Sequence, residues 1–154
     1  MAIIFTRVDN RLIHGQVVEG WLPVLKAQEV IVISADAPKS SLMQKMLRMS
    51  LPQNYSLKIF SPQEGAPYLK EPSVQKQFVL LESVKDLKEI LDSGIKLDCV
   101  NIGNVQYEEG KEDYGGGIFL SGTEASILKG ISDSGIKIDI RALPSSMSGG
   151  RFFK

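Results

Sequence analysis

The sequence is poor in the residues that cross-link or metallate a small protein. Its 154 residues include one cysteine and one histidine, so an internal disulfide is excluded and a zinc site is not expected. A single cysteine fits a reducing compartment such as the cytoplasm. Eighteen basic and eighteen acidic residues balance to a formal charge of zero, which argues against nucleic acid as a partner.

Long apolar segments are also missing. No apolar run approaches the ~20 residues that a membrane-crossing helix needs. The N-terminal stretch carries no charged region ahead of its apolar residues, so we do not expect a signal peptide. The remaining composition is ordinary, 43% hydrophobic and 23% charged, at a common size for one domain. We therefore expect a single domain over residues 1–154, with a loose tail over 145–154.

Short apolar segments alternate with helical patterns along the whole chain. The apolar segments are rich in β-branched and aromatic residues, which is typical of strands. The expected strands are 2–8, 29–34, 56–60, 77–81, 97–102, 118–120 and 136–143, and the expected helices are 14–27, 41–49, 62–69, 83–92 and 121–134. This alternation indicates an α/β fold, a three-layer α/β/α arrangement whose mainly parallel, doubly wound sheet has about six or seven strands.

Four local features carry further expectations. Pro23 falls inside the first helical pattern and should kink or break it, because proline removes a backbone donor. Ser83 should cap the helix that follows it. The last strand alternates isoleucine with charged residues, so it should lie at a sheet edge with one face in water. Cys99 stands within an apolar run and should be a buried thiol.

The residues with the most chemistry stand together between the first strand and the first helix. Two arginines, a carboxylate and the only histidine fall in the run Arg7-Val8-Asp9-Asn10-Arg11-Leu12-Ile13-His14-Gly15-Gln16-Val17. Parallel α/β sheets hold their ligands at the ends of such strands. A neutral imidazole has a lone pair that can attack phosphorus. We interpret the run as a phosphate-handling loop with the histidine as its nucleophile.

The neighbours of the histidine have matching candidate roles. The guanidinium groups of Arg7 and Arg11 are suited to hold phosphoryl oxygens. Asp9 would fix the tautomer of the imidazole or steady one of the arginines. Gly15 lets a phosphate approach the backbone at the start of a helix, and Gln16 offers a side-chain amide.

Other interpretations of these residues stay open. A lone histidine at a helix start is commonly a cap or a packed ring, and Arg7 and Arg11 could be surface ion-pair partners of Asp9 and Glu19. A small-anion or nucleotide-binding module without covalent chemistry is a further alternative. Its weakness is that no glycine-rich nucleotide fingerprint follows the first strand.

The same eleven residues, followed by Trp21, resemble the start of the IIB component of the mannose/sorbose class of the bacterial phosphoenolpyruvate-dependent sugar phosphotransferase system (PTS). The resemblance implies that His14 accepts a phosphoryl group from a phosphohistidine on the IIA protein. His14 would pass it to a sugar bound by the IIC/IID membrane complex, a phosphohistidine–sugar phosphotransferase activity. By the same resemblance Arg7 and Arg11 would stabilise the phosphoryl group in transfer. The family fold is a mainly parallel sheet with its first strand in the interior and helices on both faces.

Further expectations follow from this resemblance. No metal or organic cofactor is needed, because positioning and guanidinium charge supply most of what phosphoryl transfer requires. The protein would work in the cytoplasm, recruited by its partners to the inner face of the membrane. A homodimer is left open, with Trp21-Leu22-Pro23 contributing to a surface. The loops at 82–83 and 101–104 should flank the histidine.

The chain departs from the family pattern in three places. The run Ser34-Ala35-Asp36 stands where the family typically has an Asn-Asp pair, and Asn104 stands where a second glycine is usual. The stretch 107–117 is also unusual for the family. These departures motivate an alternative function, a regulatory IIB-like protein whose phosphorylation state controls a partner rather than sugar import.

Overall fold

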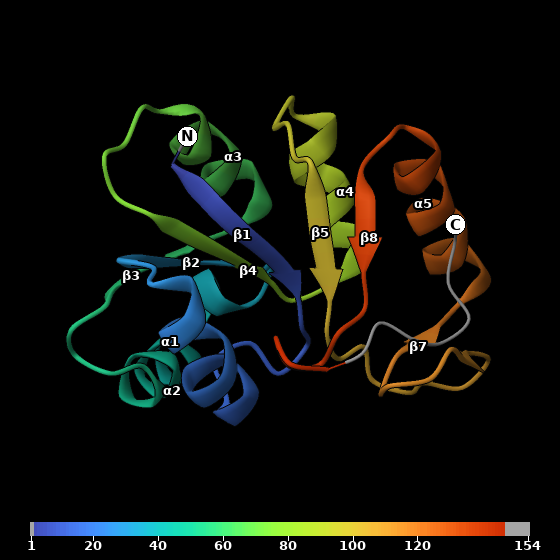
Figure 1. Ribbon diagram of the computed structural model, residues 1–154, viewed down its shortest axis with the longest axis horizontal. Coiled ribbons are helices and arrows are strands. Elements are labelled where there is room, and N and C mark those ends of the chain that lie inside the picture. The colour runs from blue at the N-terminus through green and yellow to red at the C-terminus, as the bar shows by residue number, and fades with distance from the viewer. Residues whose placement is uncertain (1, 147–154) are drawn as a thin grey trace.

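Six parallel strands form the central sheet of the protein, in the order β3-β2-β4-β1-β5-β8 (Figure 1). The structure is a computed structural model that describes residues 2–146. The strands of the sheet are β1 (Ile3–Val8), β2 (Glu29–Ile33), β3 (Ser56–Phe60), β4 (Gln77–Leu81), β5 (Cys99–Ile102) and β8 (Lys137–Asp139). β1 pairs with β4 on one side and β5 on the other, so it lies in the interior. The predicted α/β fold, with its last strand at an edge, is confirmed.

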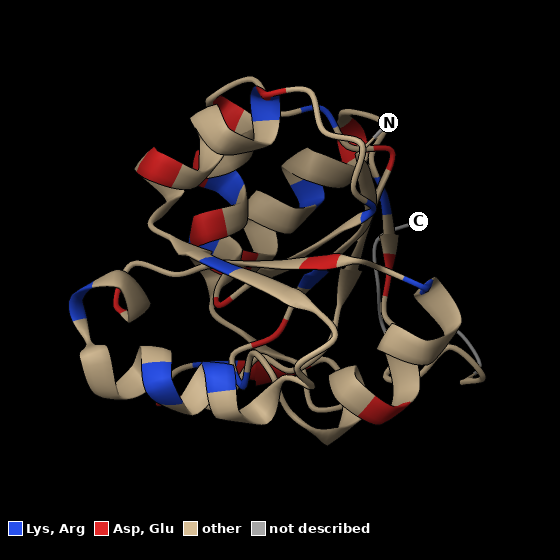
Figure 2. Cartoon of the chain, turned by 90° about the vertical axis from the view of Figure 1, so that its left-hand side faces the viewer, with Lys and Arg blue, Asp and Glu red and all other residues tan. Residues whose placement is uncertain are grey.

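Helices cover both faces of this sheet, because consecutive residues of a strand point to opposite sides. Val30 and Val32 pack against the layer of the π-helix η1 (Gln16–Trp21), α1 (Leu22–Leu25) and α2 (Ser41–Ser50). Ile31 and Ile33 pack against the layer of α3 (Pro62–Lys70), α4 (Val84–Asp92) and α5 (Gly122–Asp133). A short 3-10 helix, η2 (Ala37–Lys39), leads into α2. Figure 2 shows the sheet between the two layers.

Side-chain caps begin the later helices. The hydroxyl of Ser83 accepts the N–H of Asp86 at 3.1 Å, which confirms the cap predicted for α4. Ser121 and Glu124 form a reciprocal capping box at the start of α5. These caps satisfy N–H groups that a helix leaves unpaired, so both helix starts are fixed locally by the sequence.

The helix after β1 differs from the prediction at Pro23. The chain passes from the wide turns of η1 directly into α1, and Pro23 lies in the first turn of α1, where proline is tolerated. The N–H of Leu22 bonds to the carbonyl of Val17, five residues back. The predicted kink or break is therefore replaced by a change of helix type, and helical structure ends at Lys26, whose φ is +55°.

The strand predicted over 118–120 lies outside the central sheet. β7 (Phe119–Leu120) pairs antiparallel with β6 (Glu112–Asp113) in a separate two-stranded sheet. Gly115, Gly116 and Gly117 connect them with φ angles of 88°, 62° and 82°, which favour glycine. The prediction was wrong about the sheet because a two-residue strand carries no signal for its partner.

The charged face of β8 is only partly in water, because Lys137 is exposed as predicted but Asp139 is buried. Asp139 is only 7% exposed. Its carboxylate accepts hydrogen bonds from Asn101 Nδ2 at 2.8 Å and from Arg141 Nε at 3.0 Å. The charged side of this strand is therefore solvated at Lys137 and joins a buried polar network at Asp139.

The first helical layer also corrects the expected surface at Trp21-Leu22-Pro23. Trp21 is 2% exposed and Leu22 is fully buried, so only Pro23 of the three reaches solvent. The ring of Trp21 stacks on Phe5 with their centres 4.5 Å apart. In the C-terminal segment, Ser146 N–H closes a turn on the carbonyl of Leu143 at 3.0 Å. The remainder of the predicted tail, 147–154, lies outside the described residues.

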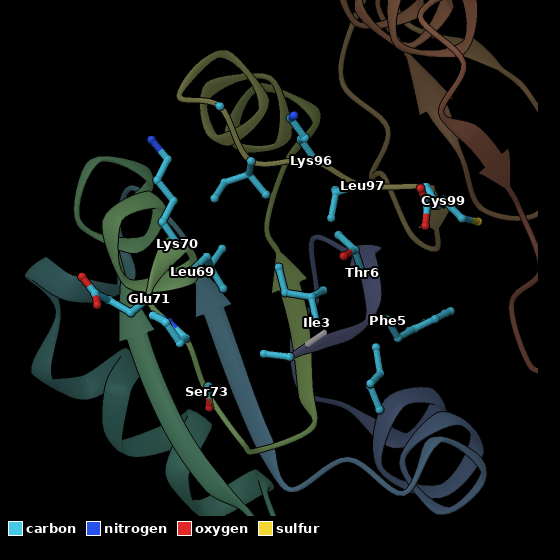
Figure 3. Close-up of a pocket in the computed structure, with 16 residues that line it drawn as sticks. Ile3, Phe5, Thr6, Leu69, Lys70, Glu71, Ser73, Lys96, Leu97 and Cys99 are labelled. Carbon is cyan, nitrogen blue, oxygen red and sulfur yellow. The ribbon is translucent and has the colours of Figure 1, made fainter.

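Cys99 is exposed, so the buried thiol predicted there is wrong. β5 pairs with β1 only where Asn101 and Ile102 meet Arg7 and Val8, and the two strands diverge toward their amino ends. The divergence opens a cavity of about 690 Å³ that is lined in part by residues 2–6 and 94–99. Figure 3 shows the sulfur of Cys99 pointing away from this cavity. An apolar run alone does not reveal that neighbouring strands separate.

Candidate functional site

The turn that follows β1 is organised by Asp9. The Oδ1 atom of Asp9 accepts the N–H of Arg11 at 2.9 Å, and its carbonyl accepts the N–H of Leu12 at 3.0 Å. Leu12 adopts a φ of +56°, a region uncommon for leucine, while its side chain is 2% exposed in the first helical layer. Burial of the Leu12 side chain stabilises this turn. The turn brings His14 back into contact with Asp9.

His14 uses one ring nitrogen inside the protein. Its Nε2 lies 2.7 Å from Asp9 Oδ2. A carboxylate only accepts hydrogen bonds, so this geometry assigns the proton to Nε2 and the lone pair to Nδ1. Nδ1 has no hydrogen-bond partner in the described part of the chain, where Gln77 Oε1 is the only buried side-chain nitrogen or oxygen without one. Nδ1 is therefore open to solvent, although the side chain of His14 is only 9% exposed.

Asp9 is fully buried yet surrounded by donors. Besides His14, its Oδ2 accepts hydrogen bonds from Arg7 Nε at 3.1 Å and Asn104 Nδ2 at 3.0 Å. Burial by itself would raise the pKa of this carboxyl. The hydrogen bond with His14, the charge of Arg7 and the amide of Asn104 outweigh burial and hold the pKa of Asp9 below its usual value. A negative charge is thus fixed directly behind the imidazole.

Arg7 is also fully buried, and its guanidinium is used internally. Nη1 donates to Asn101 Oδ1 at 2.6 Å and to the carbonyls of Arg141 and Ala142, each at 3.3 Å. Nη2 donates to Gln16 Oε1 at 3.0 Å. The side chain has no exposed surface with which to touch an incoming phosphoryl group. In this structure Arg7 supports the carboxylate behind the histidine and ties β1 to the C-terminal segment.

Gly103 makes room for the Arg7 guanidinium. A Cβ atom at position 103 would lie 2.3 Å from Cζ and Nη2 of Arg7, closer than any real contact. Trp21 packs on the same guanidinium, with its ring centre 5.7 Å from Cζ, and donates its indole N–H to the carbonyl of Ala142 at 2.8 Å. The arginine is therefore enclosed as well as paired.

Arg11, Gly15 and Gln16 have donors without partners in the turn that carries the histidine. Arg11 is exposed, and its guanidinium makes no hydrogen bond or ion pair within residues 2–146, so the alternative pair with Glu19 does not form. No atom lies within 4 Å of the place where a Cβ of Gly15 would stand. The backbone N–H groups of Gly15 and Gln16 have no partner among the described residues.

Gln16 and Asn104 connect the turn to the loop after β5. Gln16 Oε1 accepts from Arg7 Nη2 and, at 3.2 Å, from Asn104 Nδ2, which leaves its own Nε2 as a donor. Asn104 thus confirms that the loop at 101–104 flanks the histidine. Ser83 lies on the other loop that was expected to flank the histidine, and its hydroxyl accepts the N–H that caps α4.

The structure brings together His14 and the five residues that the sequence singled out with it, and it adds supporting residues to which the sequence analysis gave no role. Asn101, Gly103 and Asn104 lie in the 101–104 segment that was expected to flank the histidine but had no assigned role, whereas Asp139 and Arg141 were not expected at the site. Asn101 had a readable signal, because it is a polar residue inside an otherwise apolar strand. Asp139 was read as part of a solvated face, so its buried contact was not foreseen.

A comparison with protein-family models identifies the family of the chain. The model described as PTS system sorbose subfamily IIB component matches residues 3–150. The chain belongs to this family. As a PTS IIB component it has a sugar phosphotransferase role, with IIA and membrane IIC components as partners. Among residues 2–146, no helix combines the length and apolar character needed to cross a membrane.

Individual relatives agree with this PTS assignment over almost the whole chain. The sorbose-specific EIIB component of Lacticaseibacillus casei is 27% identical over 150 residues, 96% of this chain and 92% of that protein. The fructose-specific EIIB component of Bacillus subtilis is 25% identical over the same length and shares. The crystal structure of the IIBSor domain of the sorbose permease from Klebsiella pneumoniae matches with a TM-score of 0.90 at 25% identity, covering 97% of this chain and 93% of that one.

Proposed function

We propose that the protein carries phosphoryl groups on His14, from a phosphohistidine of a IIA protein to a sugar bound by a IIC/IID membrane complex. The observation that carries this proposal is the 2.7 Å contact between Asp9 and Nε2, which leaves Nδ1 as the open nitrogen. The work would be done on the cytoplasmic side of the membrane, where the partners recruit the protein.

In the first step the Nδ1 lone pair attacks the phosphorus of the donor's phosphohistidine. A new N–P bond forms on His14 while the N–P bond of the donor breaks, and the donor imidazole leaves with the electron pair of that bond. The ring of His14 becomes a positively charged phosphoimidazolium that keeps its proton on Nε2. Asp9 stabilises this charge as it develops, because the carboxylate is already in place and cannot reorganise into water.

In the second step a sugar hydroxyl oxygen attacks the same phosphorus. The O–P bond forms, the N–P bond of His14 breaks, and Nδ1 regains its lone pair. The hydroxyl proton passes to a base in the acceptor complex. His14 then returns to the state seen here, with the Nε2 proton still held by Asp9.

The remaining residues divide into two roles. Arg11, the N–H groups of Gly15 and Gln16 and the amide of Gln16 would hold the phosphoryl oxygens. This role is supported by their donors, which have no partner in the described part of the chain. Arg7 is a positioning residue, because its donors already point at Asp9, Asn101 and Gln16. Guanidinium and backbone donors then replace the water that a phosphoryl group loses on binding.

Labelling tests this proposal directly. The protein is incubated with labelled phosphoenolpyruvate, the general phosphotransferase proteins and the cognate IIA protein. We expect an acid-labile label on the wild type and none on His14→Ala, with the folded state of the variant checked by circular dichroism. A label that survives acid, or one that remains on His14→Ala, would overturn the assignment.

A regulatory role is a second candidate, and Asn104 favours it. This residue stands where the family resemblance implies a glycine, and its side chain bonds the loop after β5 to both Asp9 and Gln16. Phosphorylation of His14 would therefore change the hydrogen bonds that hold this loop. Vesicles reconstituted with a IIC/IID complex separate the two roles. Production of sugar phosphate by the phosphorylated protein supports transport, whereas phosphorylation without sugar phosphate supports regulation.

A further inference from the structure

Helix α2 presents an apolar stripe that nothing in the described chain covers. Leu42, Met46 and Met49 follow one another at helical spacing and are 68%, 59% and 78% exposed. Leu47 on the opposite side is 6% exposed and seats the helix on the sheet. Contiguous exposed apolar groups of this kind mark interaction sites.

The stripe lies in a basic surface with no acidic residue of its own. Lys45 shares the face of the three apolar residues and Arg48 lies beside it, and neither forms an ion pair in the described part of the chain. Between Asp36 and Glu64 the chain has four basic residues and no acidic one. Figure 2 shows the blue bands of this helix in the lower layer. The surface of α4, in contrast, mixes lysine with aspartate and glutamate.

This surface begins at the edge of the sheet that carries His14. All six strands are parallel, so the carboxyl ends of β1 and β2 meet at one edge. β1 leads there to the histidine, and β2 leads through η2 to the first turn of α2. Leu12 and Ile13 of the site turn belong to the same buried cluster as Leu47. A protein that approaches His14 from this edge therefore meets α2 on the way.

We propose that Leu42, Lys45, Met46, Arg48 and Met49, the α2 face, form the docking surface for the phosphoryl-donor protein. The donor is expected to present an acidic surface around an apolar centre. This inference rests on the proposed function and adds to it the place where the IIA protein binds. The donor brings a doubly negative phosphoryl group by diffusion, and a basic face without acidic residues raises the rate of such encounters.

The methionines suit a surface that binds and releases a protein repeatedly. Every methionine within residues 2–146 lies on α2, two of them on the exposed face. Methionine side chains are flexible and polarisable, so they adapt to the contours of a partner. A lipid surface fits less well, because α2 has ten residues and exposes no aromatic side chain, whereas interfacial helices bury a longer apolar face.

Charge reversal tests the α2 face. The rate of phosphoryl transfer from the phosphorylated IIA protein is measured against donor concentration for wild type and for K45E/R48E. The matched control is K85E/K96E, which makes the same change of charge at exposed positions in and after α4, on the other face of the sheet. A second variant, M46Q/M49Q, removes apolar surface without changing charge.

We expect the half-saturating donor concentration to rise about tenfold in K45E/R48E, with the rate at saturation changed less than about twofold. M46Q/M49Q should also raise the half-saturating donor concentration, whereas K85E/K96E should leave it unchanged. Added salt should weaken phosphoryl transfer to the wild type more than to K45E/R48E. An unchanged half-saturating concentration in K45E/R48E would overturn the docking surface while leaving the proposed function intact. Loss of binding to anionic phospholipid vesicles with unchanged transfer kinetics would also overturn it, in favour of a membrane. A wild type that takes no label from the donor would instead defeat the proposed function itself.

Discussion

Asp9 Oδ2 and His14 Nε2 lie 2.7 Å apart, and the same oxygen lies 3.1 Å from Arg7 Nε. One buried oxygen thus joins the proposed nucleophile, which faces solvent, to the guanidinium of Arg7, which does not. The histidine receives a fixed proton on one nitrogen and a nearby negative charge. Both properties come from buried residues that a phosphoryl group on His14 would not touch.

Replacing the Asp9 carboxylate tests this link. Asp9→Asn keeps the shape but removes the charge, so the phosphoimidazolium loses its stabilisation and the tautomer is no longer fixed. We expect the rate of His14 phosphorylation to fall by at least about 100-fold. The free energy of unfolding should fall by about 3 kcal/mol, because the buried Arg7 loses its ion-pair partner. Quench-flow labelling and urea unfolding measure the two effects. Asp36→Asn, at an exposed position, should change neither. Wild-type phosphorylation by Asp9→Asn would contradict the role of the carboxylate.

The two arginines should respond differently to lysine. Arg11 is exposed and unpaired within the described chain, so Arg11→Lys should leave the free energy of unfolding within about 0.5 kcal/mol of wild type. It should slow phosphoryl transfer about tenfold, because the bidentate fork is lost.

Arg7→Lys should instead lower the free energy of unfolding by about 3 kcal/mol, since one ammonium cannot reach acceptors on Asp9, Asn101 and Gln16 together. Chemical denaturation of the two variants side by side gives the comparison. Equal stability losses would contradict the division of roles between Arg7 and Arg11.

Gly103 and Gly15 form a second contrasting pair. Gly103→Ala places a Cβ atom 2.3 Å from the Arg7 guanidinium, so we expect the free energy of unfolding to fall by about 1–3 kcal/mol. Gly15 has a helical φ of −53° and open space beside it, so Gly15→Ala should not destabilise the protein. Thermal unfolding of both variants measures the difference. A stable Gly103→Ala would show that the guanidinium has room to move.

Asp86 should make stability depend on pH near neutrality. Burial, with Glu82 and Glu89 adding to it and Ser83 opposing it, raises the pKa of Asp86 to about 6 from its ordinary 3.8. The folded state therefore favours the protonated carboxyl. Its contribution to stability is full below about pH 4 and is lost as the pH rises through about 6.

Asp86→Asn removes this charge at every pH. The difference between a pKa of 3.8 and one of about 6 corresponds to at most about 3 kcal/mol of stability. The free energy of unfolding of the variant should therefore exceed that of the wild type by up to this amount at pH 8. The two proteins should be nearly equal at pH 4. Urea unfolding at both pH values checks this, and an advantage of the same size at pH 4 and pH 8 would contradict the proposed cause.

The fold was largely readable because its signals are local. The continuous apolar run of β2 predicts a strand covered on both faces, and every residue of it is buried. Ser83 predicts the start of α4, because the N–H group that it caps belongs to Asp86, only three residues later. Errors arose where a second segment decides the outcome. Cys99 is exposed because β5 parts from β1, and Asp139 is buried because Asn101 lies beside it.

The candidate site shows the same limit. The turn from Asp9 to Gln16 is contiguous, so its residues could be picked out together. Arg7 was expected to face the phosphoryl group, yet its environment is made by residues more than ninety positions away, such as Asn101 and Ala142. Periodicity and spacing carry no information on such contacts. The clue that was available was the polar residue in the middle of β5.

The contacts of Arg7 with the carbonyls of residues 141 and 142 also set an order of events during synthesis. The proposed nucleophile and its carboxylate leave the ribosome well before β8 and the carbonyls that follow it. Until then the guanidinium beneath the turn lacks two of its acceptors. A nascent or truncated chain that ends before residue 137 therefore contains every residue of the turn that carries His14. It lacks the carbonyls that hold the Arg7 guanidinium beneath that turn. On the proposed function, we expect efficient phosphoryl transfer only to chains that already include residues 141 and 142.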